Sequence, residues 1–174
     1  PETAYRFAAA IEMIHSYSLV HDDLPSMDND DFRRGQPSCH KVFGEGIAVI
    51  AGDLLLNLAF ETMLDSSGTV CPDAHWRAMR TVAKAAGGRG MVLGQDLDLG
   101  LEEAPFSTVT IEEVERMAQL KTGSLIACAL ETAGHLCSAY EVDLRDLRQA
   151  GQHLGLAFQI RDDILDGIDL SDQF

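Results

Sequence analysis

Acidic and basic side chains adjoin each other between residues 21 and 35, and they are the first candidates for chemistry. The segment reads HDDLPSMDNDDFRRG, in which five aspartates run directly into two arginines. Carboxylates bind divalent cations, and guanidinium groups bind phosphate oxygens in pairs of hydrogen bonds. The pattern therefore indicates a site at which a metal held by these carboxylates and the guanidinium groups of Arg33 and Arg34 bind a diphosphate from two sides.

The local order of this segment favours some cation sites over others. Pro25 should make the chain bulge before Asp28 returns. An EF-hand does not fit, because the glycine and the bidentate glutamate that its loop needs at the sixth and twelfth positions are missing. The simpler alternative is a disordered acidic turn.

A second acidic cluster occupies residues 159–166, which read QIRDDILD. Helical spacing places Gln159, Asp162 or Asp163, and Asp166 along one side of a helix. Carboxylates this close repel one another, which implies a compensating cation, and hard oxygen ligands suit magnesium. The alternative is a solvated helix end, but the preceding residues 155–158 (GLAF) are typical of a packed interior.

Apolar residues recur at helical spacing along the chain, and this predicts an all-α fold. Phe7, Ile11, Ile14 and Ser18 share one face of the first expected helix. Thr110 with Glu113, and Ser138 with Glu141, are capping-box patterns that predict two helix starts. The expected helices cover residues 3–21 and 44–64, two shorter segments on either side of 87–88, a segment after 110 that weakens at Gly123, and a long segment after 138. No linker divides the chain, so one domain over residues 1–174 is expected.

Composition limits the partners. The 174 residues include 28 acidic and 13 basic side chains, a net charge of −15, which argues against nucleic-acid binding. An anionic substrate is compatible with this charge only if clustered acids recruit divalent cations. The four cysteines form no metal-binding pair, and free thiols favour a cytoplasmic location. No apolar run approaches the length of a membrane span, so no span is expected.

Four motifs together resemble those of one enzyme family. DDLPSMDNDDFRRG resembles the first aspartate-rich motif of the trans-isoprenyl diphosphate synthases, the polyprenyl synthetase family, and FQIRDDILD resembles the second. GQDLD at 94–98 and KTG at 121–123 also match, in the family's order. The resemblance covers nearly the whole chain and is closest to bacterial farnesyl diphosphate synthases. It implies an isoprenoid synthase-type helical bundle around a central cavity, truncated here at both ends, and a homodimer.

The resemblance also implies roles for single residues. Three magnesium ions would bind to Asp22, Asp23, Asp28 and Asp162. Asp163 and Asp166 would support that site, directly or through water, and Asp98, beside Gln95 on one helical face, would brace it. Arg33 would bind the allylic diphosphate, while Arg34 and His15 would bind isopentenyl diphosphate. The residues around the allylic diphosphate and the developing cation would be Lys121, Thr122 and Gln159.

The implied reaction joins an allylic diphosphate, dimethylallyl or geranyl, head to tail with isopentenyl diphosphate after magnesium-assisted ionisation. Tyr17, five residues before Asp22, would be the floor that limits product length, and the small Ser18 beside it fits a farnesyl product. Replacing Tyr17 with alanine should then lengthen the product. Tyr17 as an ordinary core residue is the alternative, and the two interpretations are compatible.

Rival functions share part of this pattern. A geranylgeranyl synthase differs only in product length. A terpene cyclase usually mixes Asn, Ser or Thr with Glu in its second metal motif, whereas residues 162–166 carry only aspartates as ligands. A non-catalytic prenyltransferase subunit and an acidic metal-binding module also stay open. Because family members extend beyond both ends of this chain, we expect it alone to bind magnesium and to be weakly active or inactive.

Overall fold

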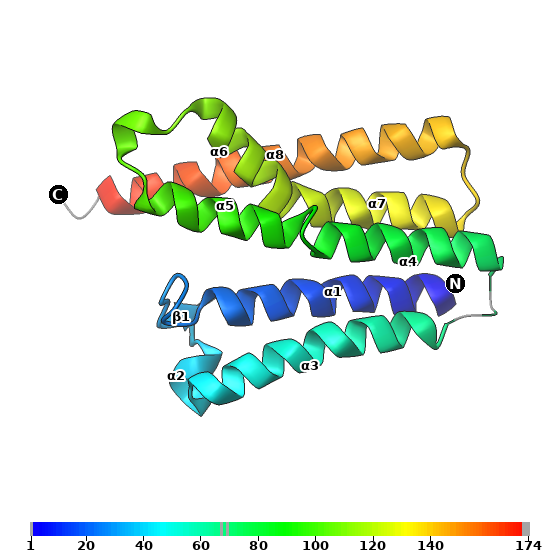
Figure 1. Ribbon diagram of the computed structural model, residues 1–174, viewed down its shortest axis with the longest axis horizontal. Helices are drawn as coiled ribbons and strands as arrows, with labels where there is room; N and C mark the ends of the chain where they lie inside the picture. Colours follow the sequence, from blue (N-terminus) through cyan, green and yellow to red (C-terminus); the bar gives the residue numbers. More distant parts are fainter. Residues whose placement is uncertain (1, 67, 69, 172–174) are drawn as a thin grey trace. The chain divides into compact units, whose positions relative to one another are not determined.

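The structure is a computed structural model that describes residues 2–66, 68 and 70–171, with side chains throughout except at Phe106, Asp163 and 166–171. Helices make up nearly all of its regular structure, which confirms the all-α prediction (Figure 1). The chain divides into two compact units, Pro1–Pro72 and Asp73–Phe174. The single catalytic domain expected from the sequence stays a prediction.

The first unit is built on two long antiparallel helices, α1 and α3, which lie side by side (Figure 1). The buried face of α1 includes Phe7, Ala10, Ile14 and Tyr17, at the three- and four-residue spacing of one helical stripe. The elements of the first unit are α1 (Glu2–Asp22), β1 (Phe32–Arg33), β2 (Gln36–Pro37), α2 (Cys39–Phe43) and α3 (Glu45–Leu64). The apolar stripe thus fixes which side of α1 meets α3, and it leaves the acidic end of α1 at the start of the loop that follows.

A glycine lets the two long helices approach near that acidic end. A Cβ atom at Gly52 of α3 would lie 2.0 Å from Nε2 of His21 on α1, so any side chain there would force the His21 ring to move. The same His21 nitrogen lies 3.1 Å from the carbonyl oxygen of Val49, within hydrogen-bonding distance. The close approach therefore positions the residue directly before the aspartate pair.

A short hairpin closes the acidic loop, which the sequence analysis did not foresee. β1 and β2 pair antiparallel, with Arg33 opposite Gln36. Both residues of the connecting turn have positive φ, 54° at Arg34 and 75° at Gly35, as the preferred two-residue hairpin turn requires. The usual signal for such a turn is Asn-Gly or Asp-Gly, and an arginine in the first position hid it.

In the second unit, the regular structure of the described residues is helical throughout. Its helices are α4 (Pro72–Ala86), α5 (Met91–Glu103), η1 (Phe106–Thr108), α6 (Ile111–Ala118), η2 (Gln119–Gly123), α7 (Ser124–Leu136) and α8 (Glu141–Ser171). α7 and α8 lie side by side (Figure 1). The predicted capping box at the start of α6 is confirmed, because the backbone N–H of Glu113 donates to the Thr110 hydroxyl and that of Thr110 donates to the Glu113 carboxylate. Where weakening at Gly123 was expected, η2 is a turn of π-helix.

The second predicted capping box is wrong. Ser138 has a φ of 56° and belongs to the end of α7, and α8 begins only at Glu141. The N–H of Ala139 donates to the Gly134 carbonyl at 2.9 Å and that of Ser138 to the His135 carbonyl at 3.0 Å. These two bonds satisfy carbonyls that the end of α7 leaves free. Ser138 and Ala139 therefore cap the end of α7 and do not cap the start of α8.

The helix α3 corrects the expectation that no apolar segment reaches the length of a membrane span. α3 is long and apolar enough to cross a membrane by length and composition alone, although one such helix is weak evidence for a span. Charged residues within α3, such as Asp53 and Glu61, interrupt its apolar run, and the expectation rested on uninterrupted length. Several apolar side chains of α3 are also exposed, including Ile47, Ile50, Leu54 and Leu58.

Candidate active site

The loop after α1 folds back on itself and brings Asp28 to Asp22. The backbone N–H of Asp28 donates to the Asp22 carbonyl at 2.9 Å, and that of Asn29 donates to the Leu24 carbonyl at 3.0 Å. Asn29 has a φ of 54°, a left-handed conformation that asparagine adopts more readily than most residues. The predicted return of Asp28 is therefore confirmed at the level of the backbone.

Asp23 and Arg33 bind each other within this loop. Asp23 has a side chain that is only 4% exposed, and its Oδ1 accepts hydrogen bonds from Nε of Arg33 at 2.9 Å and from Nη2 at 2.5 Å. Hydrogen bonding to Asp23 raises the pKa of Arg33 against the opposing effect of its burial, and the charges of Asp23, Asp30 and Asp22 add to the rise. The hairpin thus returns the predicted phosphate-binding arginine onto a predicted metal ligand.

The other basic candidate of the loop is placed differently. Arg34 occupies the hairpin turn and is exposed. Beyond the hairpin, Lys41 forms an ion pair with Asp31 at 2.6 Å. Of the two arginines that the sequence pointed to, Arg33 forms ion pairs with Asp23 and Asp30 within the described loop, and Arg34 lies at its surface.

The predicted product-length residues lie on α1 before the loop. Tyr17 is buried, and its ring meets that of His21 edge-on at a centroid distance of 5.7 Å. Burial, and to a smaller extent the charge of Asp22, raises the pKa of Tyr17. Ser18 donates its hydroxyl hydrogen to the backbone carbonyl of His15 at 2.9 Å. This packing fits Tyr17 as a core residue and is compatible with a floor, so both interpretations stay open.

In the second unit, residues of three separate motifs lie together. Lys121, in η2, forms an ion pair with Asp98 of α5. Thr122 donates its hydroxyl hydrogen to Oε1 of Gln159 on α8 at 2.8 Å. Side chains from GQDLD, KTG and FQIRDD are therefore joined by direct contacts, although they lie up to 61 positions apart in the chain, from Asp98 to Gln159.

Glycines make these contacts possible, because the backbones themselves touch. A Cβ atom at Gly94 would lie 2.1 Å from the backbone nitrogen of Lys121. A Cβ atom at Gly155 would lie 2.3 Å from Cα of Gly123. No real side chain tolerates such distances, so both positions require glycine. The side-chain nitrogen of Gln95, one residue after Gly94, is buried and has no hydrogen-bond partner within the described part of the chain.

Asp162 follows Gln159 on the same helix. It accepts a hydrogen bond from Arg161 at 2.9 Å, and the Arg161 guanidinium lies 4.8 Å from the centre of the Phe158 ring. The side chains of Asp163 and Asp166 lie outside the described residues. Among the side chains that are described, no group of three His, Cys, Asp or Glu residues is arranged to hold a metal ion. The two aspartate clusters belong to different units, so their convergence on shared metal stays a prediction.

The donor set itself fits magnesium. Asp22, Asp28 and Asp162 offer carboxylate oxygens, and neither of their motifs contains a cysteine. Hard oxygen donors with room for water are the ligands that magnesium prefers.

One buried carboxylate, Glu131, is not part of any motif that the sequence pointed to. Glu131 in α7 binds Arg148 of α8 through two hydrogen bonds, one of them 2.8 Å from Nε to Oε2. Burial raises the pKa of Glu131, but hydrogen bonding and charge from Arg148, with a smaller effect of His135, outweigh it and leave the pKa below its usual value. A single acid within the apolar run CALETAGHL was the signal that could have found it.

Comparison with known proteins supplies a family. Residues 1–174 match the polyprenyl synthetase family over the full chain. The chain is 47% identical to a farnesyl diphosphate synthase of Geobacillus stearothermophilus over 167 residues, which cover 95% of this chain and 55% of that protein. It is 46% identical to geranylgeranyl pyrophosphate synthase 3 of Arabidopsis thaliana, over 94% of this chain and 46% of that protein. The chain thus spans about half the length of the curated relatives it matches.

A solved structure agrees with the fold. The geranyltransferase of Helicobacter pylori complexed with magnesium and isoprenyl diphosphate superimposes with a TM-score of 0.85 at 33% identity, over 93% of this chain and 52% of that one. This likeness extends the all-α assignment to the isoprenoid synthase type of helical fold.

Proposed function

The chain belongs to the polyprenyl synthetase family, and on that premise we propose that it is part of a short-chain trans-prenyltransferase. The reaction condenses an allylic diphosphate, dimethylallyl or geranyl, head to tail with isopentenyl diphosphate. One observation carries the proposal: Lys121 bound to Asp98 and Thr122 bound to Gln159 bring the side chains of three motifs together, next to the helix turn of Asp162. A regulatory or purely structural chain has no need for this polar arrangement between backbones in contact.

The side chains divide the work of binding. Arg33 and Lys121 hold the diphosphate of the allylic substrate, while Arg34 and His15 hold that of isopentenyl diphosphate. When Arg33 binds the diphosphate, it keeps part of its contact with Asp23, because one guanidinium can hydrogen-bond to both groups through different nitrogens. Thr122 and Gln159, fixed by their mutual hydrogen bond, present oxygens near the carbon that becomes positively charged.

Magnesium is the proposed cofactor, with three ions per site. The residues that would hold it are Asp22, Asp23, Asp28 and Asp162, supported by Asp98, Asp163 and Asp166. When bound, magnesium supplies positive charge that stabilises the departing diphosphate. The magnesium-bound Helicobacter pylori relative supports this choice of metal.

The proposed chemistry follows from charge and exclusion of water. The bond between the allylic carbon and its diphosphate breaks, and basic side chains such as Arg33 and Lys121 take up the released negative charge. The double bond of isopentenyl diphosphate then attacks the allylic cation, and a proton leaves to the released diphosphate. Apolar residues of α1, including Ile14 and Tyr17, keep water away from the cation.

Farnesyl diphosphate is the proposed product. Support comes from Tyr17, which is buried one and a half helical turns before Asp22, and from the bacterial farnesyl diphosphate synthase that is 47% identical. Geranylgeranyl diphosphate is the second candidate, because a relative named for that product is 46% identical.

The test is to incubate the complete protein with geranyl diphosphate, isopentenyl diphosphate and magnesium, and to size the products. A fifteen-carbon diphosphate is expected, and a twenty-carbon product would correct the length alone. Cyclic hydrocarbons, or no consumption of isopentenyl diphosphate, would overturn the proposal. Lys121→Ala should lower turnover at least about hundredfold, as loss of a charge-stabilising group usually does, whereas Lys41→Ala, in the ion pair with Asp31, should leave it nearly unchanged.

A homodimer in the cytoplasm completes the proposal. The exposed apolar side chains of α3 recur at three- and four-residue spacing on one face, which suits contact with a second copy of the chain. Light scattering on the purified protein measures the mass directly, and a monomer at micromolar concentration would overturn the dimer.

A further inference from the structure

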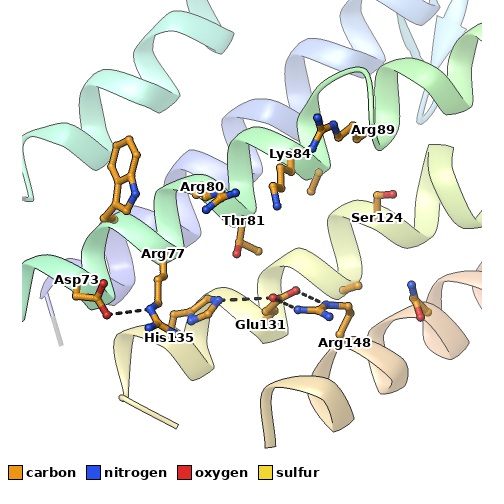
Figure 2. Close-up of a pocket in the computed structure, with 14 residues that line it drawn as sticks. Asp73, Arg77, Arg80, Thr81, Lys84, Arg89, Ser124, Glu131, His135 and Arg148 are labelled. Carbon is orange, nitrogen blue, oxygen red and sulfur yellow. Dashed lines mark hydrogen bonds and ion pairs between the residues drawn. The ribbon is translucent and has the colours of Figure 1, made fainter. Parts of the chain in front are cut away.

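The polar face of α4 lines a pocket of about 700 Å³ within the second unit. Asp73, Arg77, Arg80 and Lys84 follow one another at three- and four-residue spacing, opposite the buried stripe that contains Ala78 and Val82. The facing wall comes from α7 and α8. In Figure 2, Thr81 and Lys84 point from α4 towards α7 across this space.

One end of the pocket is neutralised by ion pairs. Arg77 contacts Asp73 at 2.8 Å and Glu141 at 2.9 Å. Arg148 binds Glu131, whose carboxylate also lies 3.5 Å from His135. Each cation at this end therefore has a carboxylate partner (Figure 2), which leaves little net charge to attract a ligand there.

The other end carries cations without such partners. Arg80, Lys84 and Arg89 line the pocket, and no ion pair within the described residues involves any of them. Arg80 and Lys84 are about 6 Å apart along the helix axis. Cations near the last turn of a helix are favoured by its dipole, but like charges one turn apart repel each other. A cluster of positive charge in a chain of net charge −15 points to an anion.

An aromatic ring stands at the rim of the same pocket. Trp76, the single tryptophan of the sequence, lines it and is 64% exposed. Trp76 and Arg80 are four residues apart on one helix, so the two positions share a face of α4. A flat or apolar group attached to an anion can pack against this ring while the anion contacts the cations.

We propose that this pocket binds an organic di- or triphosphate. The phosphate groups contact Arg80, Lys84 and Arg89, and the organic group lies against Trp76. A chain of two or three phosphates can bridge cations one helical turn apart, and charge-assisted hydrogen bonds to guanidinium groups are the strongest available to it. No residue of this site belongs to the aspartate-rich motifs or to the KTG and GQDLD motifs, so binding needs no magnesium and does not depend on the proposed function.

The experiment measures binding by calorimetry in the presence of EDTA, which removes any metal-dependent diphosphate binding. Three probes separate the possible sources: inorganic tripolyphosphate, ATP and geranyl diphosphate. Saturable binding by at least one probe is expected, together with a change in the emission of Trp76, which reports from the pocket itself. Tighter binding of ATP indicates a nucleotide as the ligand, tighter binding of geranyl diphosphate indicates a prenyl diphosphate, and equal binding of all three indicates recognition of the phosphates alone.

Matched variants locate the site. Arg80→Gln and Lys84→Gln should each weaken binding about tenfold or more, because each loses a charged contact to phosphate. Arg145→Gln removes an exposed charge of α8 outside the pocket and should change affinity by less than about twofold. Asp162→Asn should likewise leave binding in EDTA unchanged. The proposal fails if no probe binds saturably, if Arg145→Gln weakens binding as much as Arg80→Gln, or if Asp162→Asn abolishes it.

Discussion

The aspartate-rich loop, residues 21–35, and the glycine contact, formed by Gly94, Gly155 and residues 121–123, place polar side chains in two different ways. In the loop, hydrogen bonds and the pair of Arg33 with Asp23 fix the geometry. In the glycine contact, backbones meet so closely that a single Cβ atom has no room. The comparison teaches that the loop depends on groups that attract each other, whereas the contact depends on the absence of a side chain.

Adding one methyl group to the glycine contact should have the largest effect. In Gly155→Ala the new Cβ meets Cα of Gly123 at 2.3 Å, so α8 and η2 must separate. We expect a loss of about 3 kcal/mol in the free energy of unfolding, at the upper end for overpacked sites, measured by urea denaturation. The matched control is Gly100→Ala in α5, where nothing lies within 4 Å, and it should stabilise the helix by about 0.5–1 kcal/mol. Equal stability of the two variants would refute the claim that the glycine contact depends on the absence of a side chain.

Removing the cation of the loop should have the next largest effect. Arg33→Ala leaves the buried carboxylate of Asp23 without its ionic partner. Breaking a buried pair can cost 3–5 kcal/mol, but Arg33 is about one-third exposed and water screens part of this, so we expect about 2 kcal/mol in thermal or urea unfolding. Arg34→Ala, at the exposed turn, should change stability by less than about 0.5 kcal/mol. If both arginines proved equivalent, the pair would not organise the loop.

Loss of a hydrogen bond within the glycine contact should lower stability less than the addition of a methyl group there. Thr122→Val keeps the shape of the side chain but removes the hydroxyl that donates to Gln159. We expect a loss of about 1 kcal/mol in unfolding free energy, with Thr122→Ser close to the unchanged protein because it retains the donor. A loss as large as that of Gly155→Ala would mean that polar attraction dominates in both regions.

The smallest expected effect is on the pH dependence of stability. Glu131, like Asp23, is a nearly buried carboxylate bound by an arginine, and its pKa lies below the usual 4.5. A depressed pKa stabilises the fold above the unfolded-state pKa, and this contribution is lost as the pH falls through the folded-state pKa. Stability measured from pH 6 down to pH 3 should therefore fall less steeply in Glu131→Gln, while Glu115→Gln, an exposed acid of α6, should retain the original slope.

Local sequence was a reliable guide where the relevant interactions are local. The helix of α1, the capping box of Thr110 and the return of Asp28 follow from residues within a few positions of one another. The capping-box pattern gave a wrong prediction at Ser138, because the end of α7 and the start of α8 lie in one short segment. Which of two helices a residue serves depends on where each is packed, and the pattern of neighbours does not contain that information.

The sequence by itself determined the order of the motifs, the family, the all-α class and the chemistry that the side chains can perform, since these depend on residue type and on periodicity along the chain. Only the tertiary structure decided that Arg33 returns to Asp23, that Lys121 meets Asp98, and that the polar face of α4 lines a pocket. These contacts join residues from different elements. They depend on how closely helices and turns approach, which is set by packing in three dimensions and by glycines whose role is invisible until the neighbouring backbone is in place.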